Sequence, residues 1–150
     1  MNINSIAASD VMCLMEAYVL LELHEKINIP SLLTNAESWN LNKGEMDNLE
    51  RIELQAIKQL FNLPVHTPTP AIIFTFGLLY TRFRIHQKQL LYLHKILKRY
   101  SHWTKQTLMV LQSKNMGWYK TIMETLNEHE MPTDLATITS IPRRTWAKTK

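Results

Sequence analysis

The chain has 150 residues, of which 45% are hydrophobic and 20% are charged, and this composition suits a globular domain rather than a disordered one. The single cysteine, Cys13, excludes an intrachain disulfide and a cysteine-based metal site, and its apolar neighbours predict a buried structural thiol. The sequence shows no secretory signal and no apolar run long enough to predict a transmembrane helix. We therefore expect an intracellular protein, in the nucleus or the cytoplasm, with no membrane partner.

The formal net charge of +4 is unevenly distributed along the chain. Residues 1–53 contain nine acidic and three basic side chains, whereas residues 54–123 contain ten basic side chains and no acidic one. Residues 124–150 contain four of each. The acid-free stretch favours an anionic partner such as nucleic acid. A basic surface that only aids solubility is the alternative.

The first predicted helix begins at a cap formed by Ser9 or Asp10 and runs to about Glu25, where Asn28 and Pro30 end it. Its apolar residues recur with the spacing of an amphipathic helix. The segment 30–39 is short and can start with another helical turn.

The clearest predicted helix spans Glu45–Asn62. Its predicted apolar face comprises Leu49, Ile52, Ala56 and Leu60. The proline-rich stretch His66–Pro70 predicts a rigid break, after which Pro70 can open a helix over Ala71–Phe76. Gly77 is expected to stop or bend that helix.

A long helix is predicted over Thr81–Tyr100. At 100° per residue, four cationic side chains and one aromatic fall within a sector of about 80°, and three leucines fall on the opposite side. The stripe consists of Arg84, Lys88, Tyr92, Lys95 and Arg99, and the leucines are Leu90, Leu93 and Leu97. Any surface helix turns Lys and Arg away from its leucines, but that rule does not explain why acids are missing. We therefore predict that the stripe binds nucleic acid.

Further helices are predicted over Trp103–Lys114 and over Met116–Glu128, the latter capped by Asn115, and Pro132 and Asp134 open a weak final segment. No sustained period-two alternation predicts a strand. We expect an all-α fold, an irregular bundle of about five to seven helices, in a single domain spanning 1–150. Within it lie an acidic part (1–44), a basic helical core (45–130) and a weakly ordered basic tail (131–150).

The sequence lacks the groups that catalysis requires. Its three aspartates lie in different segments, so they do not form the carboxylate cluster of a two-metal polymerase site. The pairs Glu22/Glu25 and Glu50/Glu53 are expected to be solvated, and His86 and His94 to be polar surface or phosphate contacts. With no HExxH or CxxC motif, we predict no catalytic residue, no metal and no cofactor.

The order of several short motifs resembles the region that follows the polymerase core in non-LTR (LINE-like) retrotransposon reverse transcriptases. In that family the first motif reads roughly P-x-L-L-Y-G-x-E-x-W. The matching residues are Pro30, Leu32, Leu33, Glu37 and Trp39, with Thr34 and Asn35 in place of Tyr-Gly. The later matches are Leu49–Arg51 and Lys58, Leu63–Pro64, Thr69–Pro70, Gly77–Leu78 and Leu91–His94, with Thr75 where a Glu is common. Together they cover about residues 10–120.

The resemblance implies a position in a larger enzyme rather than an activity. In the family this region forms a helical thumb and its continuation, which grips the template–primer duplex by its backbone, whereas the catalytic aspartates lie in the preceding core. It therefore implies that the chain is a truncated, non-enzymatic piece of an RNA-directed DNA polymerase. Its predicted partner is an RNA–DNA hybrid or primer–template, with the polymerase core as a further one. Cations of the stripe would contact phosphates, and Tyr92 would stack on a sugar or base.

Two other interpretations remain open. The chain can be a helical protein-interaction scaffold, in which the acidic N-terminal third pairs with the basic middle within one molecule or between two. It can also be a fragment with no selected function.

Overall fold

The computed structural model describes residues 15–99, 102–140 and 142 of the chain. All regular structure in these ranges is helical and none of it is a strand, which confirms the predicted all-α irregular bundle. The chain divides into two compact units: Met1–Thr34 with Arg51–Leu79, and Asn35–Glu50 with Tyr80–Lys150. Among the described residues, no helix combines the length and the apolar composition that a membrane crossing requires.

The first unit begins with helical residues 15–23, followed by the π-helical turn η1 (His24–Asn28) and by α2 (Ile29–Leu32). The prediction that Asn28 and Pro30 end the first helix is wrong. The amide of Ile29 donates to the carbonyl of His24, five residues back, so the wider turn carries the chain past Asn28. Pro30 is the second residue of α2, which continues directly from that wider turn. The further helical turn expected after Pro30 is confirmed, whereas the predicted cap at Ser9 or Asp10 and the thiol of Cys13 lie outside the described residues.

The helix α3 (Lys43–Leu60) lies within two residues of its predicted bounds. Asn42 and Glu45 form a capping box: the Glu45 amide donates to Asn42 Oδ1 at 3.0 Å, and the Asn42 amide donates to Glu45 Oε2 at 2.8 Å. These two bonds satisfy amides that the first helical turn otherwise leaves without partners.

The predicted apolar face of α3 is wrong, because Ile52 is 57% exposed and Ala56 is exposed. The buried side chains of α3 are Met46, Glu53 and Ile57. Glu53 lies in the middle of this buried face, and for that reason the hydrophobic pattern alone predicted a face about 75° away from it around the helix axis.

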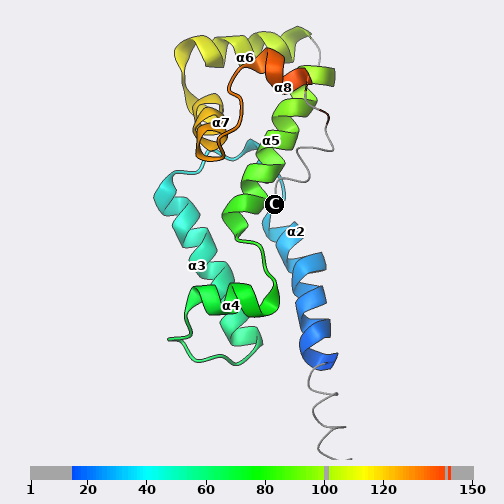
Figure 1. Ribbon diagram of the computed structural model, residues 1–150, viewed down its shortest axis with the longest axis vertical. Coiled ribbons are helices and arrows are strands. Elements are labelled where there is room, and N and C mark those ends of the chain that lie inside the picture. Colours follow the sequence, from blue (N-terminus) through cyan, green and yellow to red (C-terminus); the bar gives the residue numbers. More distant parts are fainter. Residues whose placement is uncertain (1–14, 100–101, 141, 143–150) are drawn as a thin grey trace, which may run out of the picture. The chain divides into compact units, whose positions relative to one another are not determined.

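The last turns of α3 pack against α4 (Thr69–Phe76), which crosses them in Figure 1. Ile57 and Ile72 are buried together with Leu78, and the rings of Phe61 and Phe76 stack with centroids 4.3 Å apart. The predicted stop at Gly77 is confirmed: it takes a left-handed conformation (φ 61°) at the end of α4, which a side chain disfavours.

The second unit is built around α5 (Thr81–Arg99). The 3₁₀ turn η2 (Ala36–Ser38) and the helices α6 (His102–Lys114), α7 (Gly117–Glu128) and α8 (Leu135–Ser140) all pack on it or on one another. The predicted helices are confirmed to within about one residue of their bounds. Asn115 is not the cap of α7, however: it has a positive φ of 45°, and Met116 is the residue that precedes the helix.

The predicted final segment is the helix α8, which Asp134 opens. Oδ2 of Asp134 accepts hydrogen bonds from the amide and from the hydroxyl of Thr137, both at 2.9 Å. Two bonds to one oxygen at the start of the helix stabilise this short element.

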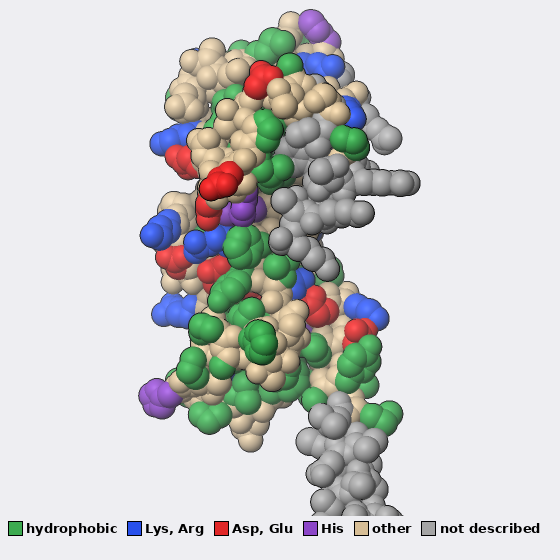
Figure 2. All heavy atoms as spheres, viewed as in Figure 1, with side chains coloured by type: hydrophobic (Ala, Val, Ile, Leu, Met, Phe, Trp, Pro, Cys, Tyr) green, Lys and Arg blue, Asp and Glu red, His purple; other side chains and the backbone are tan. Residues whose placement is uncertain are grey.

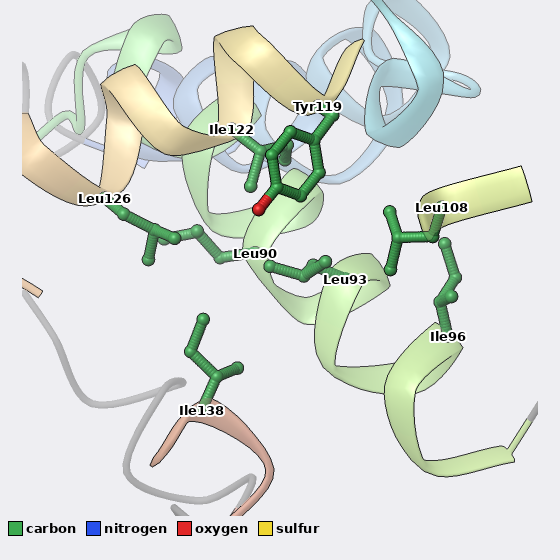
Figure 3. Close-up of a cluster of buried hydrophobic side chains, with 8 residues drawn as sticks. All are labelled: Leu90, Leu93, Ile96, Leu108, Tyr119, Ile122, Leu126 and Ile138. Atoms are coloured by element: carbon green, nitrogen blue, oxygen red, sulfur yellow. The ribbon is translucent and has the colours of Figure 1, made fainter. Parts of the chain in front are cut away.

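Four helices contribute to the core of the second unit, shown in Figure 3. Its buried side chains are Leu90, Leu93, Ile96, Leu108, Tyr119, Ile122, Leu126 and Ile138. Burying each large apolar side chain stabilises the fold by roughly 1.5–3 kcal/mol. The apolar side predicted for the long helix is confirmed, since Leu90 and Leu93 are buried and Leu97 packs against the same cluster.

Candidate nucleic-acid interface

The orientation of α5 is fixed by its buried side. Ile85 and Leu93 are fully buried, and so is Gln89, whose side-chain amide donates to the carbonyl of Trp39 at 2.8 Å. Trp118 on α7 likewise donates its indole N–H to the carbonyl of Glu37 at 2.8 Å. The segment around η2 is thereby bonded to α5 and α7, and this packing determines which side chains of α5 face outward.

The predicted stripe lies on the side of α5 opposite Leu93. Lys95 is exposed, whereas Arg84 and Lys88 are half-buried. Arg99 is the last residue of α5, and its side chain lies outside the described part of the chain. Three cationic side chains of the stripe are therefore described, and they follow one another along one helix surface.

Tyr92 has a packing role that the sequence did not predict. Its ring meets that of Trp118 edge to face, with centroids 5.7 Å apart and planes at 75°. It also packs against the core cluster of the second unit. The ring is half-buried, so only part of its surface faces outward from α5.

Arg82, in the first turn of α5, pairs with two acidic side chains of α3. Its Nη2 lies 2.5 Å from Asp47 Oδ1 and 3.3 Å from Glu50 Oε2, and its amide donates to Glu50 Oε1 at 3.2 Å. Acidic residues before position 53 thus pair with the basic middle of the chain at this point. The positive charge of Arg82 is compensated, and for that reason it does not belong to the candidate interface.

Lys98 is a candidate that the predicted stripe omitted. It is exposed and falls about 40° from Arg84 around the axis of α5. Lys105 and Lys114 are exposed on α6. Because α5 and α6 contain eight Lys and Arg and no Asp or Glu, the acid-free run was the signal that could have identified all three.

The prediction that His86 and His94 are polar surface or phosphate contacts is wrong. They are only 7% and 3% exposed, respectively. Burial, with smaller effects from the charges of His129 and Arg82, lowers the pKa of His86 from its usual 6.5 to about 4, although Glu128 acts in the opposite direction. His86 is therefore neutral at physiological pH and packs inside the second unit.

Of the two glutamate pairs, Glu50/Glu53 differs from the prediction that it is solvated. Glu53 is only 7% exposed, and its Oε1 lies 3.7 Å from Nε2 of the equally buried His24. Glu50 binds Arg82, as described above, and Glu22 pairs with Lys26 one turn away, which lowers the pKa of Glu22. Within the described ranges, no three His, Cys, Asp or Glu side chains come together in a way that would hold a metal ion.

Lys and Arg side chains do not merge into one patch on the face drawn in Figure 2, where acidic side chains lie between them. The cationic character of the candidate interface therefore rests on α5 and α6, the part of the chain without acids. Comparison of the chain with protein-family models, with curated proteins and with solved structures gave no match.

Proposed function

We propose that this chain binds the backbone of nucleic acid without reading its sequence, through cationic side chains of α5. The observation that carries the proposal is that α5 and α6 contain no acidic residue. The side of α5 opposite its cations is buried, so the cations lie on its outer side. Phosphates attract Lys and Arg wherever acids do not cancel the field, and such contacts are insensitive to base identity.

The spacing of the cations supports this function. Arg84 and Lys95 are 11 positions apart, about 16 Å along an α-helix, and Lys88 lies between them. The buried Gln89 and Leu93 hold the helix in one orientation. The backbone that carries the cations is therefore already ordered before binding, which lowers the entropic cost of binding. The interface therefore presents a short, fixed row of charges that suits the backbone of an RNA–DNA hybrid or a primer–template.

We further propose that the chain corresponds to the helical region after the polymerase core of a non-LTR retrotransposon reverse transcriptase. The motif order from Pro30 to His94 supports this assignment. In this role the chain acts inside the cell, has no catalytic residue of its own and contributes backbone contacts. Stacking of Tyr92 on a base stays a prediction, which a Tyr92→Leu variant would test.

The test is fluorescence anisotropy of a labelled RNA–DNA hybrid titrated with the purified chain over a range of salt concentrations. Substituting Arg84, Lys88, Lys95 and Arg99 together by Gln should weaken binding. It should also reduce the slope of log K against log salt by about 3 to 4, close to one unit per lost phosphate contact. A Lys95→Gln, Lys98→Gln double variant should remove about half of that slope.

The matched control is a Lys26→Gln, Lys120→Gln double variant. Both lysines are exposed and each pairs with a glutamate one turn away, so this control removes the same charge as the Lys95, Lys98 double variant without touching α5. The control should bind like the unmodified chain. Equal binding by the quadruple variant and the unmodified chain would overturn the proposal.

A further inference from the structure

The helix α7 ends in a backbone conformation that its residue type disfavours. Glu130 has a left-handed φ of 53°, and the amide of Met131 after it donates to the carbonyl of Leu126 at 2.8 Å. A hydrogen bond that reaches five residues back commonly closes an α-helix, and glycine or asparagine usually occupies the left-handed position. A glutamate at that position bears the steric cost that a Cβ meets in the left-handed conformation.

Three other described helices end in the same way, with residues that tolerate the conformation. The left-handed residue is Asn62 after α3, Gly77 after α4 and Asn115 after α6. In each case the next amide donates to the carbonyl five residues back, at 2.8 Å, 3.0 Å and 3.3 Å respectively. Of these four helix ends, the end of α7 is therefore the strained one. Strain of this kind persists where the surrounding structure holds the residue in place.

A bond between two histidine rings holds the end of α7. His129, the residue before Glu130, bonds through Nε2 to Nδ1 of His86 on α5 at 3.1 Å. His86 is buried, and the ring of Phe83 lies against that of His129 with centroids 5.7 Å apart. Met131 packs against the core cluster of the second unit. The strained residue therefore lies between one polar and one apolar attachment.

The polar attachment tolerates one added proton but not two. A neutral imidazole can accept the N–H of a protonated one, as the 3.1 Å separation between His86 and His129 requires. Two protonated rings have no acceptor nitrogen between them, and their positive charges repel each other.

The surroundings of the pair oppose protonation. Burial lowers the pKa of His86 most, and the charges of His129 and of Arg82, one turn earlier on α5, lower it further. Glu128, the exposed last residue of α7, acts in the opposite direction. The acids of α3 that pair with Arg82 are Asp47 and Glu50. A second proton is therefore bound far more readily once the rings have separated and water reaches them.

We propose that the His86–His129 bond is an acid-sensitive latch that holds the strained end of α7 on α5. When both rings take up a proton, the bond breaks, Glu130 leaves the left-handed conformation, and the amides of residues 129–131 lose their helix-end hydrogen bonds. The change stays local, because no side chain of the core cluster in Figure 3 titrates between about pH 4 and pH 7. It is independent of the proposed nucleic-acid contact, since His86 falls about 160° from Arg84 around α5.

The experiment measures amide hydrogen exchange of the full chain by NMR from about pH 7 to about pH 4, with each rate divided by that of an unstructured peptide at the same pH. The protection of the Met131 amide should fall at least about tenfold, because the open state binds more protons. The amide of Leu93 inside α5 should keep its protection. So should that of Met116, which closes α6 where the sequence 111–116 contains no histidine. A parallel fall at all three amides would overturn the proposal, since it would report unfolding of the whole unit.

Three variants separate the latch from the strain. His86→Gln can bond to His129 without titrating, so the protection of the Met131 amide should change less than about threefold with pH. Glu130→Gly relieves the strain and should raise that protection at least about threefold throughout the range. Glu130→Gln removes the charge but keeps the strained backbone, and it should stay within about twofold of the unmodified chain. An undiminished fall in His86→Gln, or the same protection in both Glu130 variants, would overturn the proposal.

Discussion

His86 and His129 hydrogen-bond to each other through their rings inside the second unit, with Nδ1 of His86 3.1 Å from Nε2 of His129. One nitrogen must carry the proton and the other must accept it, so the pair is stable only while at least one ring is neutral. The rings meet edge to face with centroids 5.3 Å apart, and Phe83 covers His129 at 5.7 Å. The bond joins α5 to the end of α7.

This pair makes the stability of the protein depend on pH. The unfolded chain protonates His86 near pH 6.5, whereas burial in the folded chain delays protonation until about pH 4. The contribution of the buried neutral ring is therefore complete above about pH 6.5, and it is lost as the pH falls to about 4. We expect a loss on the order of 3 kcal/mol across this window, measured by urea denaturation at a series of pH values.

A His86→Gln variant should flatten that profile between pH 4 and 6.5, because Gln bonds to His129 without titrating. The slope that remains would come from the other titratable groups of the chain. If the variant and the unmodified chain lose stability in parallel across the window, His86 is not the group responsible.

Gln89 bonds two segments of the second unit that lie 50 residues apart, since its side chain donates to the Trp39 carbonyl. Replacing it by Ala removes that bond and leaves a cavity, so the free energy of unfolding should fall by about 2–4 kcal/mol. Gln89→Leu keeps most of the volume and should cost less. Gln112→Ala, at an exposed site, should change stability by less than about 0.5 kcal/mol in the same denaturation experiment.

Replacing Gly77 by Ala should lower the free energy of unfolding, whereas replacing Gly44 by Ala should raise it. Gly77 has a φ of 61° with nothing within 4 Å of an added Cβ, so Gly77→Ala meets backbone strain but no clash and should cost about 1 kcal/mol. Gly44 lies in the first turn of α3, where Ala is preferred, so Gly44→Ala should stabilise the chain by about 0.5 kcal/mol. Thermal melts of both variants would measure the difference, and Gly77→Asn should fall between Gly77→Ala and the unmodified chain.

Arg82 should have a smaller coupling energy with Asp47, its nearer acidic partner, than with Glu50, its more distant one. Asp47 lies closer, but its side chain is 53% exposed, whereas Glu50 is 18% exposed. Water weakens the exposed pair, so double-mutant cycles with Ala should give a coupling below about 0.5 kcal/mol for Asp47 and about 1 kcal/mol for Glu50. A larger coupling to Asp47 would show that distance outweighs exposure here.

The sequence alone was sufficient to predict most of the helices and which side of α5 is buried. Hydrophobic spacing, the prolines before α4 and Gly77 after it act over one or two turns, so they are readable without knowledge of distant contacts. The same local geometry placed Arg84, Lys88 and Lys95 on one side of α5. Whether they bind nucleic acid stays a prediction.

Which polar side chains are buried and which cations are compensated depends on contacts between residues far apart in the sequence. Glu53 is buried because His24 faces it from 29 residues earlier in the chain, and His86 because His129 bonds to it from 43 residues later. Arg82 is compensated by acids 32 and 35 residues away. Burying a polar group is favourable only where a partner meets it, and no local pattern in a sequence specifies a partner that only folding brings near.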